Sequence, residues 1–344
     1  MQTHARVVIV GGGIVGCSTA YWLTRLGWRD VVVLDQGPLF RNWGSTSHAP
    51  GLMFQHNVSQ ALTELAKWSV ALYAQLRPPG GLACFPVGSL EVAATPERWE
   101  ELKRRVGQAL SWGLEAALLG PAEVGRLVPI MRTDHLRGAF YVPGDGVVEA
   151  AAIAEGLARE AMGRGAAFHE RTPVTGIEVA DGRVRGVATP RGRIGAEVVV
   201  SAAGIWGPLI GRLAGVPIPL TPMQHLFATT GPLPELAGET AGVRHPIVRH
   251  QDQDLYFRQY GDRYGVGSYR HEPLPVDADE LPQNDHPAIL DFTPEHFAAS
   301  LEDAAELIPA LGRADLATRF NGLFSFTPDG FPLLGESPDV RGFW

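Results

Sequence analysis

Residues 6–35 carry the pattern that most constrains the fold of this chain. Two short apolar runs, at 6–10 (RVVIV) and 31–34 (VVVL), flank a segment at 17–26 whose apolar spacing predicts a helix. Apolar runs without polar alternation are typical of strands covered on both faces, and a strand, a helix and a strand in this order form a βαβ unit. We therefore predict an α/β protein built on a parallel sheet.

A glycine-rich turn joins the first strand to the helix as Gly11-x-Gly13-x-x-Gly16, and Asp35 ends the second strand 19 residues after Gly16. Such glycines let the backbone approach a pyrophosphate, which the free N–H groups and the dipole of the helix N-terminus hold. The Asp35 carboxylate would accept hydrogen bonds from a ribose and repel a 2′-phosphate, which disfavours NADP and leaves FAD or NAD. A glycine-rich turn without a ligand is the alternative. The pattern predicts these dinucleotide-binding residues: Gly11, Gly13, Ile14, Val15, Gly16, Asp35 and Gln36.

Length, charge and cysteine content limit the class of protein. At 344 residues the chain can bury a substantial core in one large domain or two ordinary ones. A net charge of -8 argues against a nucleic-acid partner. The two cysteines, Cys17 and Cys84, are too few for a disulfide framework or a sulfur metal site. Because no apolar run is long enough to span a bilayer and no basic leader precedes the first strand, we expect a cytoplasmic protein without a membrane partner.

Further along the chain, changes of pattern divide it into two parts. Helical spacing at 60–76, a breaker cluster at 77–81 and a strand pattern at 89–95 place a domain crossing near residue 85. Additional helices are expected at 150–165 and 294–308, and hairpin turns at Asp181-Gly182, Arg191-Gly192 and Gly261-Asp262. We predict a Rossmann-type dinucleotide-binding domain from 1–85, 145–220 and 321–344, and an inserted α+β substrate domain from 86–144 and 221–320.

The loop RNWGSTSHAPGL, at 41–52, places small residues around one histidine, His48. It follows the βαβ unit directly, so it would run along a bound dinucleotide toward its reactive end, where small side chains let a flat ring lie close. On the residues alone, a loop histidine bonded to backbone is the favoured interpretation. The stretch GSTSHAPGL, however, resembles the flavin-linking loop, S/T-x-H-A-x-G-L, of the dimethylglycine oxidase, dimethylglycine dehydrogenase and sarcosine dehydrogenase branch of the D-amino-acid-oxidase-like flavoproteins.

This resemblance extends over essentially the whole chain and implies a Rossmann-type FAD-binding domain with an inserted α+β substrate domain. In that branch the histidine at the position of His48 is bonded covalently to the 8α-methyl carbon of the flavin, so FAD attached through His48 is implied. The stretch 198–207 resembles the second strand near the dinucleotide, and 325–337 resembles the segment that lines the flavin. The cofactor-binding residues that the resemblance adds are Ser45, Thr46, Ser47, His48, Leu52, Val174 and Gly204.

The resemblance also implies two catalytic residues, His225 and Tyr256, which match the histidine and tyrosine on the substrate side of the flavin. A tertiary amine must be neutral before its N-methyl carbon gives up a hydride, and a histidine can take the proton while a tyrosine orients the amine. On the residues alone, a core histidine is an equal alternative for His225, and packing is favoured for Tyr256. Arg258 or Arg270 could hold a substrate carboxylate, but in an arginine-rich chain a surface position is favoured for both. The histidines of HPIVRH (245–250) fit no metal motif, and no metal site is predicted.

The activity implied by the resemblance is FAD-dependent oxidative N-demethylation of a small N-methylated amino acid of the dimethylglycine or sarcosine type. Hydride would pass to flavin N5, and oxygen or an electron-transfer protein would reoxidise the cofactor. Two alternatives stay open: a D-amino-acid or glycine oxidase with non-covalent FAD, and a truncated, inactive flavin-binding remnant or subunit. Because the family continues beyond the position of Trp344 into a strand, a turn and a helix directed at the flavin, we expect a shortened product or a fragment whose missing elements a partner could supply.

Overall fold

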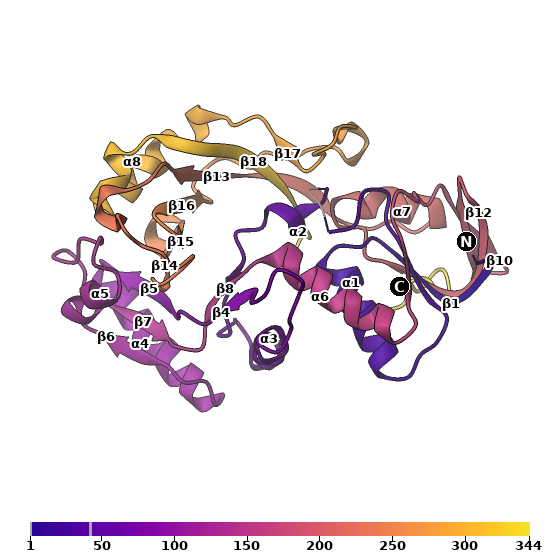
Figure 1. Cartoon of the computed structure of the whole chain (residues 1–344), viewed down its shortest axis with the longest axis horizontal. Helices are drawn as coiled ribbons and strands as arrows, with labels where there is room; N and C mark the ends of the chain where they lie inside the picture. The colour runs from indigo at the N-terminus through magenta and orange to yellow at the C-terminus, as the bar shows by residue number, and fades with distance from the viewer. Residues whose placement is uncertain (1, 41–42) are drawn as a thin grey trace.

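The computed structural model describes residues 2–40 and 43–344, so Arg41 and Asn42 of the loop around His48 lie outside the described residues. Three sheets organise the chain. Figure 1 shows two lobes: the lobe that contains both chain ends is built on a six-stranded sheet, and the other on a nine-stranded sheet. Both lobes combine strands with helices, which confirms the predicted α/β class.

β1 (His4–Val10) lies inside the six-stranded sheet, whose strand order is β10-β11-β12-β1-β2-β9. It pairs in parallel with both β12 and β2, and β2 pairs in parallel with β9. The two hairpin turns expected between 180 and 192 join β10, β11 and β12. The other strands are β2 (Val31–Leu34), β9 (Ala167–His169), β10 (Gly176–Ala180), β11 (Arg183–Thr189) and β12 (Gly192–Ser201).

Helices cover both faces of this sheet, as the apolar runs predict. Val7 shares an apolar cluster with Ala161, whereas the next residue, Val8, shares a cluster on the opposite face with Ile210. The first of these clusters involves two helices that pack against each other, α1 and α6, and the second involves α7. Their bounds are α1 (Ile14–Arg25), α6 (Ala150–Gly163) and α7 (Gly207–Ala214).

The nine-stranded sheet has the order β17-β18-β13-β16-β15-β14-β5-β7-β6. Neighbouring strands of this sheet pair in antiparallel orientation, except β14 and β5, which pair in parallel. The strands are β5 (Ser89–Ala93), β6 (Ala117–Leu119), β7 (Gly138–Val142), β13 (Thr221–Thr230), β14 (Ile247–His250), β15 (Leu255–Tyr260), β16 (Arg263–Ser268), β17 (Ile289–Leu290) and β18 (Leu316–Phe326). The associated helices are α4 (Pro96–Ser111), α5 (Pro121–Leu127) and α8 (Ala298–Leu307).

Local signals set where the helices begin. The Ser59 hydroxyl accepts a hydrogen bond from Leu62 N–H at the start of α3 (Gln60–Tyr73), and Thr95 caps α4 in the same way ahead of Pro96. The start of α3 agrees with the helical spacing predicted from residue 60. The 3₁₀ turns are η1 (Gly204–Trp206), η2 (Pro234–Leu236), η3 (Gln251–Gln253), η4 (Ala278–Glu280), η5 (Pro294–His296) and η6 (Pro309–Arg313).

Short elements lie between the two large sheets. A three-stranded sheet pairs β3 (Leu52–Met53) and β4 (Cys84–Phe85) with β8 (Gly146–Val148), and the one-turn helix α2 (Ser45–His48) contacts β18. The domain boundary predicted at residue 321 falls inside β18, which pairs with β13 along nearly its whole length. The division into a FAD-binding and a substrate domain stays a prediction.

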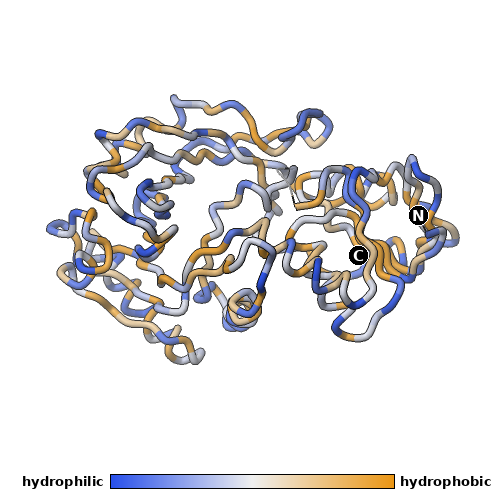
Figure 2. The backbone as a smooth tube through the Cα atoms, viewed as in Figure 1, coloured by the Kyte–Doolittle hydropathy of each residue, from blue (hydrophilic) through white to orange (hydrophobic). Residues whose placement is uncertain are grey.

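The end of the chain lies along β12 of the six-stranded sheet. Phe343 forms a parallel bridge with Val199, and the Ser201 N–H donates to the Trp344 carbonyl at 2.7 Å. Figure 2 shows apolar residues running along the strands of this lobe. Within the described part of the chain, no helix combines the length and apolar character needed to cross a membrane.

Candidate active site

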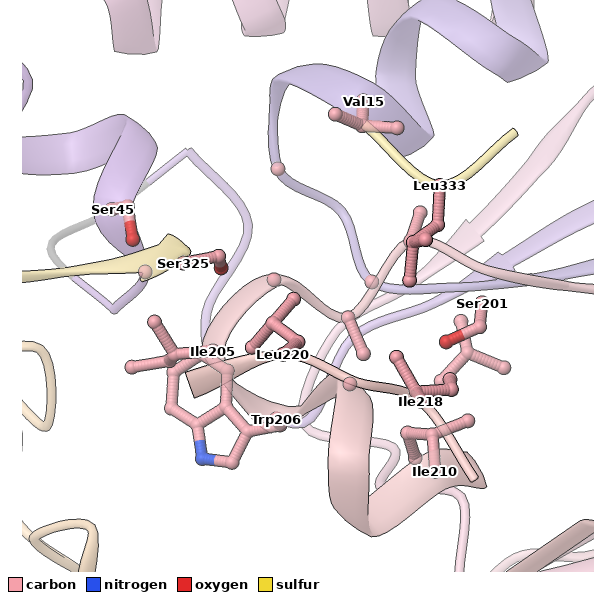
Figure 3. Close-up of a pocket in the computed structure, with 18 of the residues that line it drawn as sticks. Val15, Ser45, Ser201, Ile205, Trp206, Ile210, Ile218, Leu220, Ser325 and Leu333 are labelled. Carbon is pink, nitrogen blue, oxygen red and sulfur yellow. The ribbon is translucent and has the colours of Figure 1, made fainter. Parts of the chain in front are cut away.

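A cleft of about 960 Å³ opens beside the carboxyl ends of β1, β2 and β12. In Figure 3, Ser45 and Ser325 lie on one side of it, and Ile210 and Ile218 line another part. Most of the predicted cofactor-binding residues line this cleft: Gly11, Gly13, Ile14, Val15, Asp35, Gln36, Ser45, Thr46, Ser47, Val174 and Gly204. The other three, Gly16, His48 and Leu52, do not line it.

The glycine turn forms one wall of the cleft and has no room for side chains. Gly11 has a φ of +108°, and a Cβ there would lie 2.4 Å from the Ala202 carbonyl oxygen. Gly16 packs directly against the turn. A Cβ added at position 16 would lie 1.9 Å from the Gly11 carbonyl oxygen, so only glycine fits there. The Ile14 N–H at the start of α1 donates to the Thr46 hydroxyl at 3.0 Å. The backbone here is bare enough for a pyrophosphate to approach the helix N-terminus.

Asp35 lies at the end of β2, where the sequence places it, and its carboxylate is bonded to backbone. One oxygen accepts from Gly12 N–H at 2.6 Å and the other from Gly37 N–H at 2.7 Å. Burial raises the pKa of Asp35, although both hydrogen bonds act in the opposite direction. Each carboxylate oxygen has a further lone pair for a ribose hydroxyl.

His48 ends α2 and lies against β18. The Ser45 hydroxyl donates to the Leu323 carbonyl at 2.7 Å, which ties α2 to that strand. The His48 ring meets Phe320 edge-on, and its buried Nδ1 has no hydrogen-bond partner. Burial lowers the pKa of His48 to about 4, so the imidazole is neutral at neutral pH. A neutral imidazole with an unpartnered nitrogen has a free lone pair for bonding.

His225 on β13 and Tyr256 on β15 lie in direct contact. His225 Nε2 is 2.8 Å from the Tyr256 hydroxyl, and both side chains are buried. Burial lowers the pKa of His225 to about 3, and the nearby His271 and His48 act in the same direction. Burial also holds the pKa of the Tyr256 hydroxyl well above its usual value. The pair therefore consists of a neutral phenol and a neutral imidazole.

Two aromatic residues that the sequence did not single out complete this cluster. The Tyr269 ring lies 4.2 Å from the His225 ring between centroids, and the His271 ring lies 6.1 Å away. Both belong to the short stretch after β16, and their contact with His225 depends on a strand pairing between β13 and β16. Sequence spacing alone gives no signal for such a pairing.

The two arginines considered for a substrate carboxylate have other partners. Arg258 pairs with Glu149 and donates to the Pro50 carbonyl, and Arg270 pairs with Asp303. Within HPIVRH, His245 Nδ1 lies 3.1 Å from the Tyr264 hydroxyl. This buried hydrogen bond agrees with a structural role for His245. Across residues 2–40 and 43–344 no group of three potential metal ligands comes together.

The glycine turn, the cleft and the two-sheet architecture define a dinucleotide-binding α/β protein. The sequence pattern of the family described as FAD dependent oxidoreductase matches residues 6–344, and the chain belongs to this family. This finding confirms the predicted family resemblance and implies FAD as the cofactor. The bare glycine turn and the cleft beside it fit the pyrophosphate of such a cofactor.

Several curated relatives match over the whole chain, among them two mitochondrial dehydrogenases. Sarcosine dehydrogenase, mitochondrial, of Homo sapiens is 36% identical over 353 residues, which are 100% of this chain and 37% of the relative. Dimethylglycine dehydrogenase, mitochondrial, of Rattus norvegicus is 31% identical over 353 residues, which are 100% of this chain and 40% of the relative. The chain therefore spans 37 to 40% of the length of these relatives.

Solved structures with the same fold include two amino-acid-oxidising enzymes. L-proline dehydrogenase from P. horikoshii matches with a TM-score of 0.85 and 23% identity over 100% of this chain and 87% of that chain. Glycine oxidase from Geobacillus kaustophilus matches with a TM-score of 0.80 and 26% identity over 99% of this chain and 88% of that chain. The first likeness shows the fold alone.

Proposed function

We propose that this chain binds FAD and oxidatively demethylates a small N-methylated amino acid of the dimethylglycine or sarcosine type. The observation that carries this proposal is the buried contact between His225 and Tyr256, with His48 of α2 close by against the adjoining strand β18. The relatives at 36% and 31% identity are named for sarcosine and dimethylglycine, which supports this substrate class.

FAD would lie in the cleft, with its pyrophosphate at the glycine turn and a ribose near Asp35. Gln36 and Val174 line the part of the cleft beside Asp35, and Gly204 lines the part beyond β12. Ser45, Thr46 and Ser47 border the cleft from α2, and Leu52 continues the same segment into β3. We further propose covalent attachment through His48, because its imidazole is neutral and the unpartnered Nδ1 suits a bond to carbon.

His225 and Tyr256 would prepare the substrate amine. The burial that keeps His225 neutral would also disfavour the charged ammonium form of a bound substrate, and the imidazole has a lone pair that can pass the released proton on toward solvent. The Tyr256 hydroxyl, held 2.8 Å from Nε2, would orient the amine or a water molecule beside it. FAD supplies the two-electron acceptor when bound, and the substrate leaves as an iminium that water hydrolyses to formaldehyde and the demethylated amine.

A D-amino-acid or glycine oxidase with non-covalent FAD is the second candidate, and the likeness to glycine oxidase favours it. A flavin-binding subunit that acts together with a partner is a third, since the chain spans 37 to 40% of the length of these relatives. Oxygen or an electron-transfer protein as the final acceptor stays part of the proposal. So does a cytoplasmic location, although the names of both relatives include the word mitochondrial.

Anaerobic mixing tests the proposal directly. Flavin-loaded protein is mixed with sarcosine, dimethylglycine, glycine or D-alanine, and the flavin absorbance and released formaldehyde are recorded. We expect bleaching with sarcosine or dimethylglycine and one formaldehyde for each flavin reduced. Bleaching by glycine or D-alanine alone would support the oxidase candidate, and an oxidised flavin with all four amines would support the inactive subunit.

A further inference from the structure

Arg249 lies on the same face of the nine-stranded sheet as the proposed catalytic pair. It is directly opposite Tyr256 in the antiparallel pairing of β14 with β15, and opposed residues point to the same side. Tyr256 in turn contacts His225, which therefore shares that face. Three strand-to-strand steps of about 4.8 Å separate β13 from β14, and β15, which carries Tyr256, lies between them.

The surroundings of Arg249 leave part of its guanidinium available. The guanidinium carbon lies 4.7 Å from the centre of the Phe54 ring. With its amide oxygen turned toward the arginine, Gln251 accepts from all three guanidinium nitrogens of Arg249, from Nε at 3.1 Å, from Nη1 at 3.3 Å and from Nη2. Among the described residues, no carboxylate oxygen lies within 4 Å of this guanidinium. A guanidinium carries five N–H donors, so it can still bind a carboxylate with two parallel hydrogen bonds.

The acidic residues nearest to Arg249 are engaged elsewhere. Glu91, opposite Arg249 on β5, accepts two hydrogen bonds from Arg105 at 2.9 and 2.7 Å. Asp145 accepts from the Ser89 hydroxyl at 2.6 Å and from the backbone N–H of Gln55 at 2.9 Å. Burial lowers the pKa of Arg249, and the charges of Glu91 and Asp145 act in the opposite direction without an ion pair to Arg249 within 4 Å. A partly desolvated guanidinium without a direct ion-pair partner favours an anionic ligand.

We propose that Arg249 binds the carboxylate of the substrate and so selects amino acids over simple amines. This inference rests on the proposed function, since it assumes that the amine end of the substrate lies at His225 and Tyr256. The Tyr269 ring, next to His225 and close enough to interact with Arg249, borders the space between the two ends. In this arrangement a bound glycine derivative would direct its nitrogen toward His225 and Tyr256 and its carboxylate toward Arg249.

The test compares ligands that differ in the carboxylate. Arg249→Gln and Arg249→Lys are titrated with methoxyacetate, which carries an ether oxygen in place of the amine, and binding is followed through the flavin absorbance. Both variants are also assayed with dimethylglycine and with its methyl ester. Arg270→Gln is the control, because Arg270 is exposed and pairs with Asp303.

We expect Arg249→Gln to raise the methoxyacetate Kd and the dimethylglycine KM by about tenfold or more, with the ester changed by less than about threefold. Arg249→Lys keeps the charge but not the planar fork, so a smaller loss is expected. Equal losses for acid and ester, or an unchanged Kd, would overturn the inference. If no amine reduces the wild-type flavin, the proposed function fails, whereas the methoxyacetate titration still decides the role of Arg249.

Discussion

Gly322 on β18 lies directly against the imidazole of His48. A Cβ at position 322 would lie 2.7 Å from His48 Cδ2 and 2.8 Å from Nε2. Gly322 is also paired with His225 in the register of β13 with β18. The absence of a side chain at position 322 therefore leaves room for His48 against β18. This strand pairs with β13, which carries His225.

Gly322→Ala should displace His48 and lower the fraction of covalently bound flavin. The added methyl group meets the ring closer than real Cβ contacts allow, and α2 must move to relieve it. Gly176→Ala is the matched control, because its Cβ would make an ordinary 3.5 Å contact within a strand. The measurement is the share of flavin that stays with acid-denatured protein. Equal shares in both variants would show that Gly322 does not position His48.

Gly267→Ala should impair turnover without removing flavin. A Cβ at 267 would lie 2.0 Å from Tyr256 Cζ, so the phenol must leave its place beside His225. Tyr256→Phe, which keeps the ring and loses the hydroxyl, isolates the same contact. We expect both variants to lose about 100-fold in kcat or more, the range of a lost acid–base contact. Wild-type turnover in Tyr256→Phe would mean that Tyr256 is a packing residue.

His225 should make the protein less stable in acid. Its pKa falls from an ordinary 6.5 to about 3 on folding, so between these values the unfolded chain binds a proton that the folded chain does not. This contribution to stability is complete above about pH 6.5 and is lost progressively as the pH falls toward 3. His225→Gln should therefore reduce the dependence of unfolding free energy on pH by up to about 1.4 kcal/mol per pH unit.

Urea unfolding of the wild type and of His225→Gln, at several pH values from about 7 to about 4.5, measures this slope. His48 contributes in the same direction below pH 6.5, so some dependence remains in the variant. His4→Gln, at an exposed position, controls for the loss of a histidine. An identical slope in His225→Gln and the wild type would contradict a buried, neutral His225.

Gly16→Ala should destabilise the fold and empty the cleft. Its Cβ would lie 1.9 Å from the Gly11 carbonyl oxygen, and relieving that contact disturbs the turn that faces the pyrophosphate. We expect a loss of about 1–3 kcal/mol in unfolding free energy, as for other overpacked sites, together with loss of flavin. Gly163→Ala, at the open end of α6, should be neutral or stabilising by up to about 1 kcal/mol. Full flavin content in Gly16→Ala would contradict this role of the turn.

The sequence predicts the parts of this site that depend on near neighbours in the chain. The glycine turn and Asp35 lie within one βαβ unit, so spacing alone places them together. His48 could be assigned a role only through the family resemblance, because a loop histidine carries no distinguishing local pattern. The predicted domain boundary at residue 321 falls inside β18, because this strand pairs with β13 along nearly its whole length, and pairing partners are not visible in either segment alone.

The contact of His225 with Tyr256 joins residues 31 positions apart across an intervening strand. Alternation predicts that each strand has a buried face, but not which strands become neighbours or in which register. Arg249 was missed because arginine is abundant in this chain and its neighbours in sequence give no sign of a site. Its position opposite Tyr256 follows only from the pairing of β14 with β15.

The central claim is that a flavin lies in the cleft and is bonded to His48. Its most direct measurement is acid precipitation of folded, yellow protein, followed by absorbance spectra of the pellet and the supernatant. For the wild type and for His4→Ala we predict flavin in the pellet, and for His48→Ala we predict flavin in the supernatant. Wild-type flavin released entirely into the supernatant, or flavin retained in the His48→Ala pellet, would contradict the claim.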